Sequence, residues 1–422
     1  MSDEELPIPN YPHWPLSSIE EISEFVARGT APAYVESSNV RAIGQRCVTE
    51  AGFDDSFARP HDRRMTRHVL EPRSGDVLVN STGTGTIGRS CVFDSSGQFI
   101  VDGHITVIRP RQDLADGRWI EAIIRSPWGQ TFLEGQCYSG STNQVELSRI
   151  KLSQALIPVP SLPEQRKIAE ILGAADEVIH STQQLTAKLE QTKHGLLHDV
   201  LTQGIDVSGH LRKSPCTKGK GPLPPGWQLY PLEEIADVSR GQFTHRPRND
   251  PAYYGGEYPF IQTGDIARSA GGYINSATQS LNVRGARVSL EFPVGTIAVT
   301  IAANIADTAI LSVPMYFPDS VVGIQVRPPN NVRYVELCIR AAKPGLEARA
   351  PQSAQKNINL QDLRPLMIPV PEPREQERIA SEYETYENYA RTLRENLTKL
   401  RLMRRGLLED LLTGQARVGA SG

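Results

Sequence analysis

The sequence predicts an α+β fold in which two similar mixed α/β domains alternate with two long helices. One observation is a repeated helix entrance: "IPVPSLPEQRKIAEIL" begins at Ile157 and "IPVPEPREQERIASEY" at Ile368, 368 − 157 = 211 residues later in a chain of 422. The same distance separates "GLLHDVLTQG" at Gly195 from "GLLEDLLTGQ" at Gly406. Short β-rich runs precede each entrance. A repeat of this length indicates a duplicated unit of domain and helix, not an array of short repeats.

The first α/β domain is predicted over residues 1–160. Its runs "DVLVN", "RSCVF" and "ITVIRP" are separated by Gly, Asn and Ser, which is typical of strands, and "RWIEAIIRSPWG" predicts one helix. Later in the chain "GTIAVT" resembles "GDVLVN", and "RYVELCIRAAKP" is the counterpart of the helix. A second domain of the same kind is therefore predicted over residues 227–371. Both have an ordinary domain size.

Each domain leads into a long helix, predicted over residues 161–205 and 372–415. Pro163 and Glu164 suit a first turn, because proline lacks the N–H that is unpaired there and the helix dipole favours an acid. Apolar or small side chains then recur in alternating steps of three and four, a heptad pattern that requires a partner helix. In the first helix they are Ile168, Leu172, Ala175, Ile179, Thr182, Leu189, Leu196 and Val200. In the second they are Ile379, Tyr383, Tyr386, Ala390, Leu393, Leu397, Leu400, Leu407 and Leu411.

The sequence also indicates where these helices end and what lies at their entrances. Gly204 and Gly414 are the expected stops. Residues 206–226, rich in Gly, Pro and Lys, are predicted to be a flexible basic linker between the halves. The paired acid and amide at each entrance are interpreted mainly as helix-start residues, with docking of partner subunits as a second role. These residues are Glu164, Gln165, Glu375 and Gln376.

Composition excludes several classes of protein. A hydrophobic content of 39% and a charged content of 22% are typical of a globular chain, and no apolar run approaches the ~18 residues needed to span a membrane. The five cysteines are scattered without a CxxC, which argues against a disulfide framework or zinc site. With no basic, apolar leader at the N-terminus, we expect a cytoplasmic protein without a membrane partner. The net charge of −3 means that nucleic-acid binding would depend on local patches.

The sequence shows no catalytic motif that we recognise, and we expect neither a cofactor nor a metal in this chain. The run "GTGTIG" from Gly83 to Gly88 fits the GxGxxG pattern of dinucleotide sites, but those require a helix directly afterwards. Here a predicted strand follows, and the copy lacks the glycines, so we interpret the run as a tight hairpin loop. A nucleotide-dependent enzyme that uses this loop remains an alternative, as does a coiled-coil scaffold without a DNA role.

Four groups of residues are candidates for DNA contact. In the basic cluster "RPHDRRMTRH", Arg59, Arg63, Arg64 and Arg67 form either a solvated surface or a phosphate-binding patch; the equivalents in the second half are Arg246, Arg248, Arg284 and Arg287. The glycine-rich loop offers Thr84 and Arg89. The segments before the return to each helix are either polar turns or base-reading segments, because Asn and Gln can bind adenine through two bonds. Their candidates are Asn143, Gln144, Gln355, Lys356 and Asn357.

The order of these features resembles one known family. A variable α/β domain followed by "IPVPSLPEQRKIAEIL…GLLHDVLTQG", with both repeated, is similar to the specificity subunit of type I restriction–modification enzymes. The stretches "FIQTGDI", "LPPGW" and "SAQKNINLQDLRPLMIPVPEPREQERIA" resemble that family as well. The likeness covers nearly the whole chain.

The resemblance implies a role. Each α/β domain would be a target recognition domain that reads one half of a bipartite, asymmetric sequence in double-stranded DNA. The two helices would pair as an antiparallel coiled coil, and the duplicated chain would have pseudo-twofold symmetry. The chain itself would be non-catalytic. Two methylation subunits using S-adenosylmethionine would dock on it, and in a restricting complex two ATP- and Mg-dependent restriction subunits would join.

Overall fold

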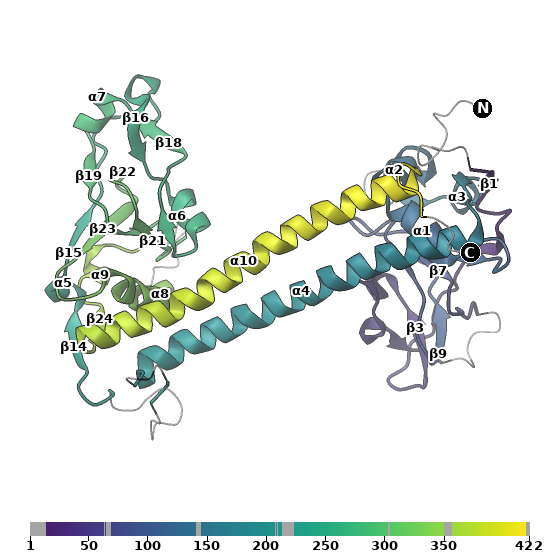
Figure 1. Cartoon of the computed structure of the whole chain (residues 1–422), viewed down its shortest axis with the longest axis horizontal. Coiled ribbons are helices and arrows are strands. Elements are labelled where there is room, and N and C mark those ends of the chain that lie inside the picture. The colour runs from purple at the N-terminus through teal and green to yellow at the C-terminus, as the bar shows by residue number, and fades with distance from the viewer. Residues whose placement is uncertain are drawn as a thin grey trace. The chain divides into compact units, whose positions relative to one another are not determined.

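The computed structural model describes residues 14–62, 64, 69–140, 145–206, 208, 210–212, 223–302, 304–349 and 357–418. The chain divides into two compact units. The first unit joins Met1–Leu185 to Leu393–Gly422, and the second is Thr186–Thr392. Each unit therefore contains one α/β domain and parts of both long helices (Figure 1).

The first domain is built around a four-stranded antiparallel sheet. In spatial order its strands are β2 (Ser23–Arg28), β10 (Ile105–Pro110), β7 (Val77–Asn80) and β8 (Ser90–Val92). Successive residues of β7 enter different cores, because side chains alternate across a sheet. Val77 and Val79 join the core that contains Trp119 of α1, whereas Leu78 joins the core that contains Phe99 of β9. Both faces are covered, which explains why the strand is apolar throughout.

The rest of the first domain covers this sheet. The second layer is β6 (Arg59–Pro60), β3 (Val40–Ile43) and β9 (Gln98–Val101), in which β3 and β9 are parallel. The small strand pairs are β1 (Leu16–Ser18) with β13 (Leu156–Pro158), β4 (Val48–Thr49) with β5 (Gly52–Phe53), and β11 (Tyr138–Ser139) with β12 (Glu146–Leu147). The helices are α1 (Gly117–Arg125), α2 (Pro127–Phe132) and α3 (Arg149–Ser153), with the short turns η2 (Gln45–Cys47), η3 (Asp55–Phe57) and the π-helical η5 (Leu133–Cys137).

The second domain repeats this plan. Its main sheet has the order β15 (Ala236–Arg240), β23 (Val321–Val326), β20 (Ile297–Thr300), β21 (Thr308–Leu311) and β17 (Tyr273–Ile274). The second sheet is β18 (Gln279–Leu281), β16 (Tyr254–Phe260), β22 (Met315–Phe317) and β19 (Leu290–Phe292). The pair β14 (Gln228–Pro231) and β24 (Met367–Val370) matches β1 and β13. The shorter helices are α5 (Leu232–Ile235), α6 (Thr263–Ser269), α7 (Val283–Arg287), α8 (Val332–Arg349), α9 (Leu360–Leu363) and η6 (Pro251–Tyr253).

The duplication extends to individual contacts. Trp14 packs edge-on against Trp119 with ring centroids 5.7 Å apart, and Trp227 packs in the same way against Tyr334 at 6.4 Å. Trp119 Nε1 donates to the carbonyl of Pro158 at 3.1 Å, and the Tyr334 hydroxyl donates to the equivalent carbonyl, that of Pro369, at 2.6 Å. In each half, one residue of the aromatic pair thus joins the domain to the strand that precedes the long helix.

The helix after the sheet differs between the halves. In the first domain it breaks at Ser126, whose side chain caps Gly129 N, and Pro127 then begins α2. A residue before proline is pushed out of the helical region, which accounts for the break. In the second domain α8 is continuous over Val332–Arg349 and contains Pro344. The sequence predicts a single helix in each domain. This prediction is wrong for the first domain, where the helix is broken into α1 and α2, and only the second domain has one continuous helix.

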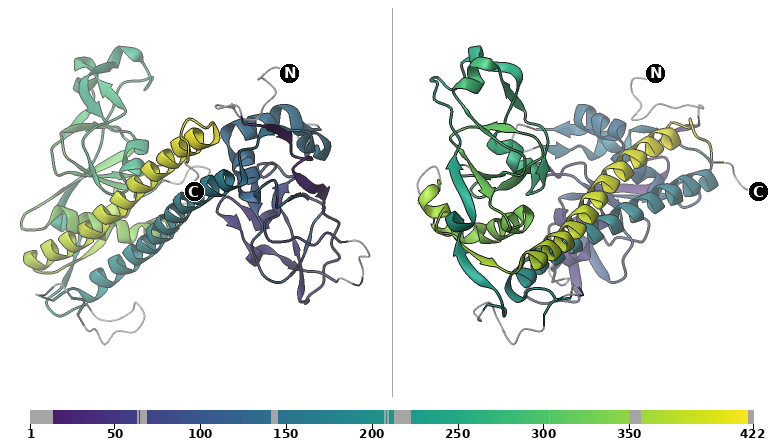
Figure 2. Two further views of the ribbon diagram at one scale, coloured as in Figure 1. Left: turned by 45° about the vertical axis from the view of Figure 1, so that its right-hand side comes forward. Right: turned by 60° about the vertical axis from the view of Figure 1, so that its left-hand side comes forward.

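The long helices are α4 (Leu162–Gln203) and α10 (Pro373–Leu412), seen from three sides in Figures 1 and 2. In the first unit the start of α4 and the end of α10 share a core, through Ile168, Leu172, Leu408, Leu411 and Leu412. In the second unit the end of α4 and the start of α10 share another, through Leu197, Val200, Leu201, Ile379 and Tyr383. The helices therefore run antiparallel, which confirms the expectation from the resemblance. Both end at a left-handed glycine, Gly204 (φ 70°) and Gly414 (φ 73°).

Every heptad side chain predicted from the sequence is buried or half-buried. The pattern misses four leucines that are also buried, namely Leu197, Leu201, Leu408 and Leu412. These leucines lie near the C-terminal ends of α4 and α10. Each end packs against the other helix and also against the α/β domain of the unit that contains that end. The apolar stripe is consequently wider there than a two-helix seam.

The described helices include none that is both long and apolar enough to cross a membrane. Four cysteines, Cys47, Cys91, Cys137 and Cys338, are buried free thiols, and Cys216 lies outside the described residues. Within the described ranges, no cluster of three His, Cys, Asp or Glu side chains is arranged to hold a metal ion.

Candidate nucleic-acid interface

The glycine-rich run of the first domain is the loop between β7 and β8. These strands are antiparallel, with Val79 opposite Ser90, so the loop closes a hairpin and a strand follows it. The helix N-terminus that a dinucleotide pyrophosphate would require is therefore not at this position. The structure confirms the hairpin interpretation. Thr84 is exposed in the loop, and Arg89 is half-buried with its Nη2 donating to the Gly85 carbonyl at 3.5 Å.

Hydrogen bonds from neighbouring side chains hold this loop in place. Gln45 Nε2 donates to the Thr82 carbonyl at 2.6 Å, and the Thr82 hydroxyl lies 2.9 Å from His104 Nδ1. Gly88 has φ +78°, and a Cβ there would lie 2.2 Å from the Tyr138 hydroxyl, which donates to the Ile87 carbonyl. Only glycine fits such a close approach. The loop is thus a fixed platform on which Thr84 is presented.

Both domains bring this loop beside the segment that leads into the short helix α3 or α9. In the first domain Thr82 forms an isolated β-bridge with Glu146, and in the second Ala302 forms one with Asn357. In each domain this loop, or its counterpart in the second domain, therefore lies beside the described end of the return segment, which comes from a distant part of the sequence. Asn357 is exposed there. Asn143, Gln144, Gln355 and Lys356 lie outside the described residues.

The basic cluster of the first domain is only partly described. Arg59 lies on β6 with its guanidinium 3.7 Å from the centre of the Tyr34 ring, a cation–π contact. The Tyr34 hydroxyl donates to Asp102 Oδ2 at 3.1 Å. Burial and the Asp102 carboxylate raise the pKa of Tyr34, so the phenol keeps the proton that it donates. Arg64 is almost fully exposed and pairs with Asp62 at 3.3 Å. Arg63 and Arg67 are outside the described residues.

In the second domain the structure separates the four candidate arginines. Arg246 and Arg248 meet at one carboxylate, because Nη2 of each donates to Asp319 Oδ2. Arg284 and Arg287 instead lie exposed on α7.

Two cavities meet at Asp319. One, of about 670 Å³, is lined by Arg240, Arg248, Asn357 and Gln361 among others. The other, of about 640 Å³, lies on the side of Tyr254. Arg248, Asp319 and Ser320 belong to both linings. We call these two adjoining cavities together the Asp319 groove.

The candidate residues predicted from the sequence do not include Asp319, Tyr34 or Asp102. Each acid lies in the turn that leads into the second strand of the main sheet in spatial order, β10 or β23. The equivalence follows from the register, since Asn80 faces Ile105 as Thr300 faces Val321. An aspartate in a turn is ordinarily explained by turn chemistry, so the only available signal was its recurrence before the same strand in both halves.

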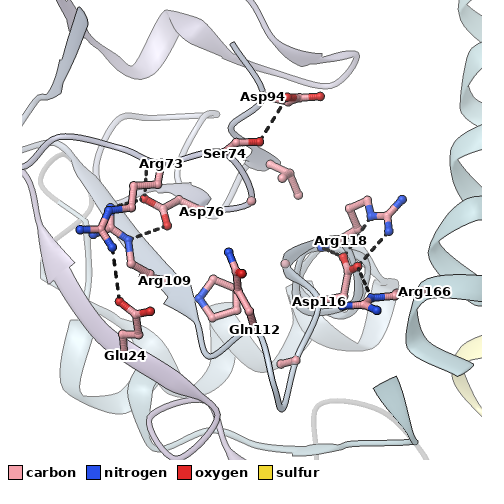
Figure 3. A pocket seen from close by; sticks show the side chains of 15 residues that line it. Glu24, Arg73, Ser74, Asp76, Asp94, Arg109, Gln112, Asp116, Arg118 and Arg166 are labelled. Atoms are coloured by element: carbon pink, nitrogen blue, oxygen red, sulfur yellow. Dashed lines mark hydrogen bonds and ion pairs between the residues drawn. The ribbon is translucent and has the colours of Figure 1, made fainter. Parts of the chain in front are cut away.

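A third cavity, of about 350 Å³, lies on the first domain beside the start of α4 (Figure 3). Its charges compensate one another. Arg109 forms a bidentate pair with Asp76, at 2.9 and 2.7 Å, and Arg118 pairs with Asp116 at 2.8 Å. Burial alone would raise the pKa of Asp116, but the bonds and charge of Arg118 hold it below its usual value. We therefore interpret this cavity as a structural junction. Its lining residues carry no net charge that would attract DNA.

The helix entrances hold the domains to the helices. Gln165 and Gln376 are fully buried, and Glu375 is 4% exposed. Glu375 accepts bonds from Ile205 N at 3.1 Å, from Trp227 Nε1 at 3.3 Å and from Arg212 Nη2 at 2.7 Å. Burial of this degree leaves no surface for a partner, so docking through these three side chains is excluded. Glu164 is half-buried.

The known proteins that are similar in sequence to this chain include specificity subunits of type I restriction enzymes. Over 380 residues the chain is 22% identical to a protein of Methanocaldococcus jannaschii named as a type I restriction enzyme MjaX specificity subunit, covering 88% of this chain and 84% of that one. Over 124 residues it is 28% identical to a Haemophilus influenzae protein named as a type I restriction enzyme specificity subunit, covering 29% of this chain and 30% of that protein.

Solved structures show the same fold. The S subunit of a type I restriction-modification system from M. genitalium matches with a TM-score of 0.58 and 13% identity, over 94% of this chain and 96% of that one. A chain from a study of assembly and conformational transition of the type I R-M system matches with a TM-score of 0.57 and 18% identity, over 97% and 99%. Residues 69–191 and 224–400 match the family described as type I restriction modification DNA specificity domain. These segments make up more than half of the chain, and the chain belongs to this family.

Proposed function

We propose that the chain is the DNA-recognition subunit of a type I restriction–modification complex, and that each domain reads one half of a bipartite, asymmetric target. One observation carries the proposal. The two domains share a strand order and a helix entrance, but their candidate DNA contacts differ. Arg59 is stacked on Tyr34 in the first domain, whereas Arg246 and Arg248 are held by Asp319 in the second. Similar frames with different contacts suit two half-sites of different sequence.

We further propose that the chain contributes no catalytic step, and that two methylation subunits using S-adenosylmethionine dock on it. In a restricting complex, ATP- and Mg-dependent subunits would join. We place a docking contact for these subunits on α10, where Leu402 and Met403 are 65% and 70% exposed. Two adjacent apolar side chains exposed to this degree fit a protein contact.

Mapping of adenine methylation at base resolution tests the central proposal. Cells would express this chain with its methylation subunit, and the genome would be read for methylated motifs. We expect one bipartite motif whose halves differ in sequence. A continuous or palindromic motif would contradict the proposal, and so would methylation that does not depend on this chain.

The docking proposal has its own test. Leu402→Ser combined with Met403→Ser should reduce co-purification of the methylation subunit without lowering the thermal midpoint of the chain. Lys399→Ser, an exposed polar position nearby on α10, is the matched control. Undiminished co-purification of the double variant would show that this part of α10 is not the contact.

A further inference from the structure

The Asp319 groove contains an arginine pair that one carboxylate positions. Asp319 Oδ2 accepts from Nη2 of Arg246 at 3.3 Å and from Nη2 of Arg248. The turn that carries Asp319 is itself fixed, because Arg240 Nε donates to the Asp319 carbonyl at 2.5 Å. The other carboxylate oxygen, Oδ1, is buried and has no hydrogen-bond partner among the described residues. The hydrogen bonds of this carboxylate therefore go to the two arginines.

The two arginines differ in how many N–H groups they have left. A guanidinium has five. Arg246 directs Nη1 to the carbonyls of Phe243 and His245, at 2.5 and 2.7 Å, in addition to its bond with Asp319. The described contacts of the Arg248 side chain are with Asp319 alone, and the side chain is 57% exposed. Arg246 thus supports the loop, and Arg248 keeps most of its donors available to a ligand.

The loop that carries these arginines is well braced. The Tyr254 hydroxyl donates to the Arg248 carbonyl. Nearby, His245 stacks on Tyr253 at 3.9 Å and its Nε2 lies 3.1 Å from Asp250 Oδ2. A donor fork on such a loop loses little conformational freedom when it binds, which is the condition for selective recognition.

This arrangement fits a base edge better than a phosphate. A phosphate contact depends on positive charge and tolerates several orientations, so a carboxylate beside the arginine weakens it. Recognition of guanine O6 and N7 requires instead a fork held in one direction, which the same carboxylate supplies. The groove around Arg248 also offers amide side chains, those of Asn249, Gln279, Asn357 and Gln361, as expected where base edges are read.

The first domain has a related device at the corresponding turn. Asp102 accepts from the Tyr34 hydroxyl, and the Tyr34 ring supports the guanidinium of Arg59. An acid before the equivalent strand, β10 or β23, thus positions an arginine in both domains, directly in one and through a tyrosine in the other. This recurrence is independent of the groove and points to the turn as a common support for DNA-contacting arginines.

We propose that Arg248 reads a guanine in the major groove of the half-site bound by the second domain, and that Asp319 is the positioning residue that aims it. The proposal rests on the proposed function, because it assumes that the second domain reads DNA. It adds the residue, the base and the supporting side chain.

Methylation mapping of the intact complex with three variants tests this assignment. Arg248→Ala should relax one guanine position in one half of the motif, with discrimination falling roughly 10-fold or more, and leave the other half unchanged. Arg248→Lys should not restore the preference, because lysine keeps the charge but lacks the fork. Asp319→Asn should relax the same position while Arg248 is still present.

The controls separate the possible failures. Arg374→Ala, at an exposed arginine in the first turn of α10 outside the candidate DNA contacts, should leave the motif unchanged, and the melting midpoint of each variant shows whether it is folded. Uniformly weaker methylation with an unchanged motif, restored by lysine, would identify a phosphate contact and overturn the proposal. An unaltered motif in Arg248→Ala would overturn it as well. If the wild-type complex shows no bipartite motif, the proposed function fails instead.

Discussion

Gln376 makes in the second half of the molecule the bonds that Gln165 makes in the first. Gln165 Oε1 accepts from Asp116 N at 2.9 Å, and Gln376 Oε1 accepts from Asn331 N at 2.8 Å. Each Nε2 donates to the carbonyl five residues earlier, that of Pro160 at 2.9 Å or Pro371 at 3.0 Å. Each also donates back to the loop before α1 or α8. The repeated glutamine is therefore a lock between a recognition domain and its helix.

Removing this lock should destabilise the chain. Gln376→Ala leaves the half-buried N–H of Asn331 and the buried carbonyl of Pro371 without their partner, and each such group costs about 1 to 3 kcal/mol when buried. We expect a loss of roughly 2 to 4 kcal/mol, visible as a lower urea midpoint for the complete chain. Gln165→Ala should behave alike.

The control for this lock is Gln191→Ala, an exposed glutamine on α4. It should stay within about 0.5 kcal/mol of the wild type. If the buried and exposed substitutions had equal effects, the lock would carry no stability, and the repetition of the glutamine would need another explanation.

Glu375 should be energetically coupled to Arg212. The carboxylate is 6% exposed and the arginine 32%, and they meet at 2.7 Å. Glu375→Ala would leave Ile205 N and Trp227 Nε1 unpaired as well, so it should cost about 3 kcal/mol, more than Arg212→Ala. A double-mutant cycle should give a coupling of about 1 kcal/mol or more. Additive effects would show that the pair contributes nothing, and Glu377→Ala, exposed on the same turn, is the neutral comparison.

The apolar stripe of α10 gives a prediction with an internal control. Leu408 is 2% exposed in a core with Trp119 of the first domain, whereas Leu402 is 65% exposed. Leu408→Ala should cost about 2 to 5 kcal/mol through lost burial and the cavity that remains. Leu402→Ala should cost less than about 0.5 kcal/mol. Both are measured by urea unfolding of the complete chain, and similar losses would contradict the assigned burial.

Much of the frame follows from sequence periodicity, and the exceptions have physical causes. The continuous apolar run of β7 and the heptads of α4 and α10 were predictable because each reflects burial along one element. Leu197 and Leu408 were not, because they are buried by a domain that folds from distant sequence. Pro127 breaks the first helix while Pro344 leaves α8 continuous, so local chemistry alone does not decide the outcome.

The candidate DNA contacts were predictable by residue type but not by arrangement. Arginine clusters are visible in the sequence, yet nothing local distinguishes Arg248 from Arg284. The distinction comes from Asp319, which lies 71 residues after Arg248 and meets it only in the folded domain. Likewise, Tyr34 supports Arg59 because β6 and the segment before β3 are brought together, as the bridge between Tyr34 and His61 shows.

Glu121 should make stability depend on pH. It is the counterpart on α1 of Glu336 on α8, which accepts bonds from Arg333 and Arg340 and from the Thr308 hydroxyl at 2.5 Å. The carboxylate of Glu121 has fewer polar contacts than that of Glu336. Arg125 is 3.5 Å away, and among the described residues Glu121 Oε1 has no hydrogen-bond partner. Burial raises the pKa of Glu121 to about 7, only partly offset by the charges of Arg125 and Arg404.

The sign follows from proton linkage. A carboxyl whose pKa is higher in the folded chain binds its proton more tightly there, so its contribution is complete below about pH 4.5 and is lost as the pH rises through about 7. The difference corresponds to roughly 3 kcal/mol at most. Glu121→Gln is neutral at every pH, so it should gain stability relative to the wild type between pH 5 and pH 8. Glu134→Gln, exposed in the same domain, should show no such trend. Urea midpoints of the three chains across this range measure the effect, and parallel curves would mean that Glu121 ionises in the folded chain as readily as in the unfolded one.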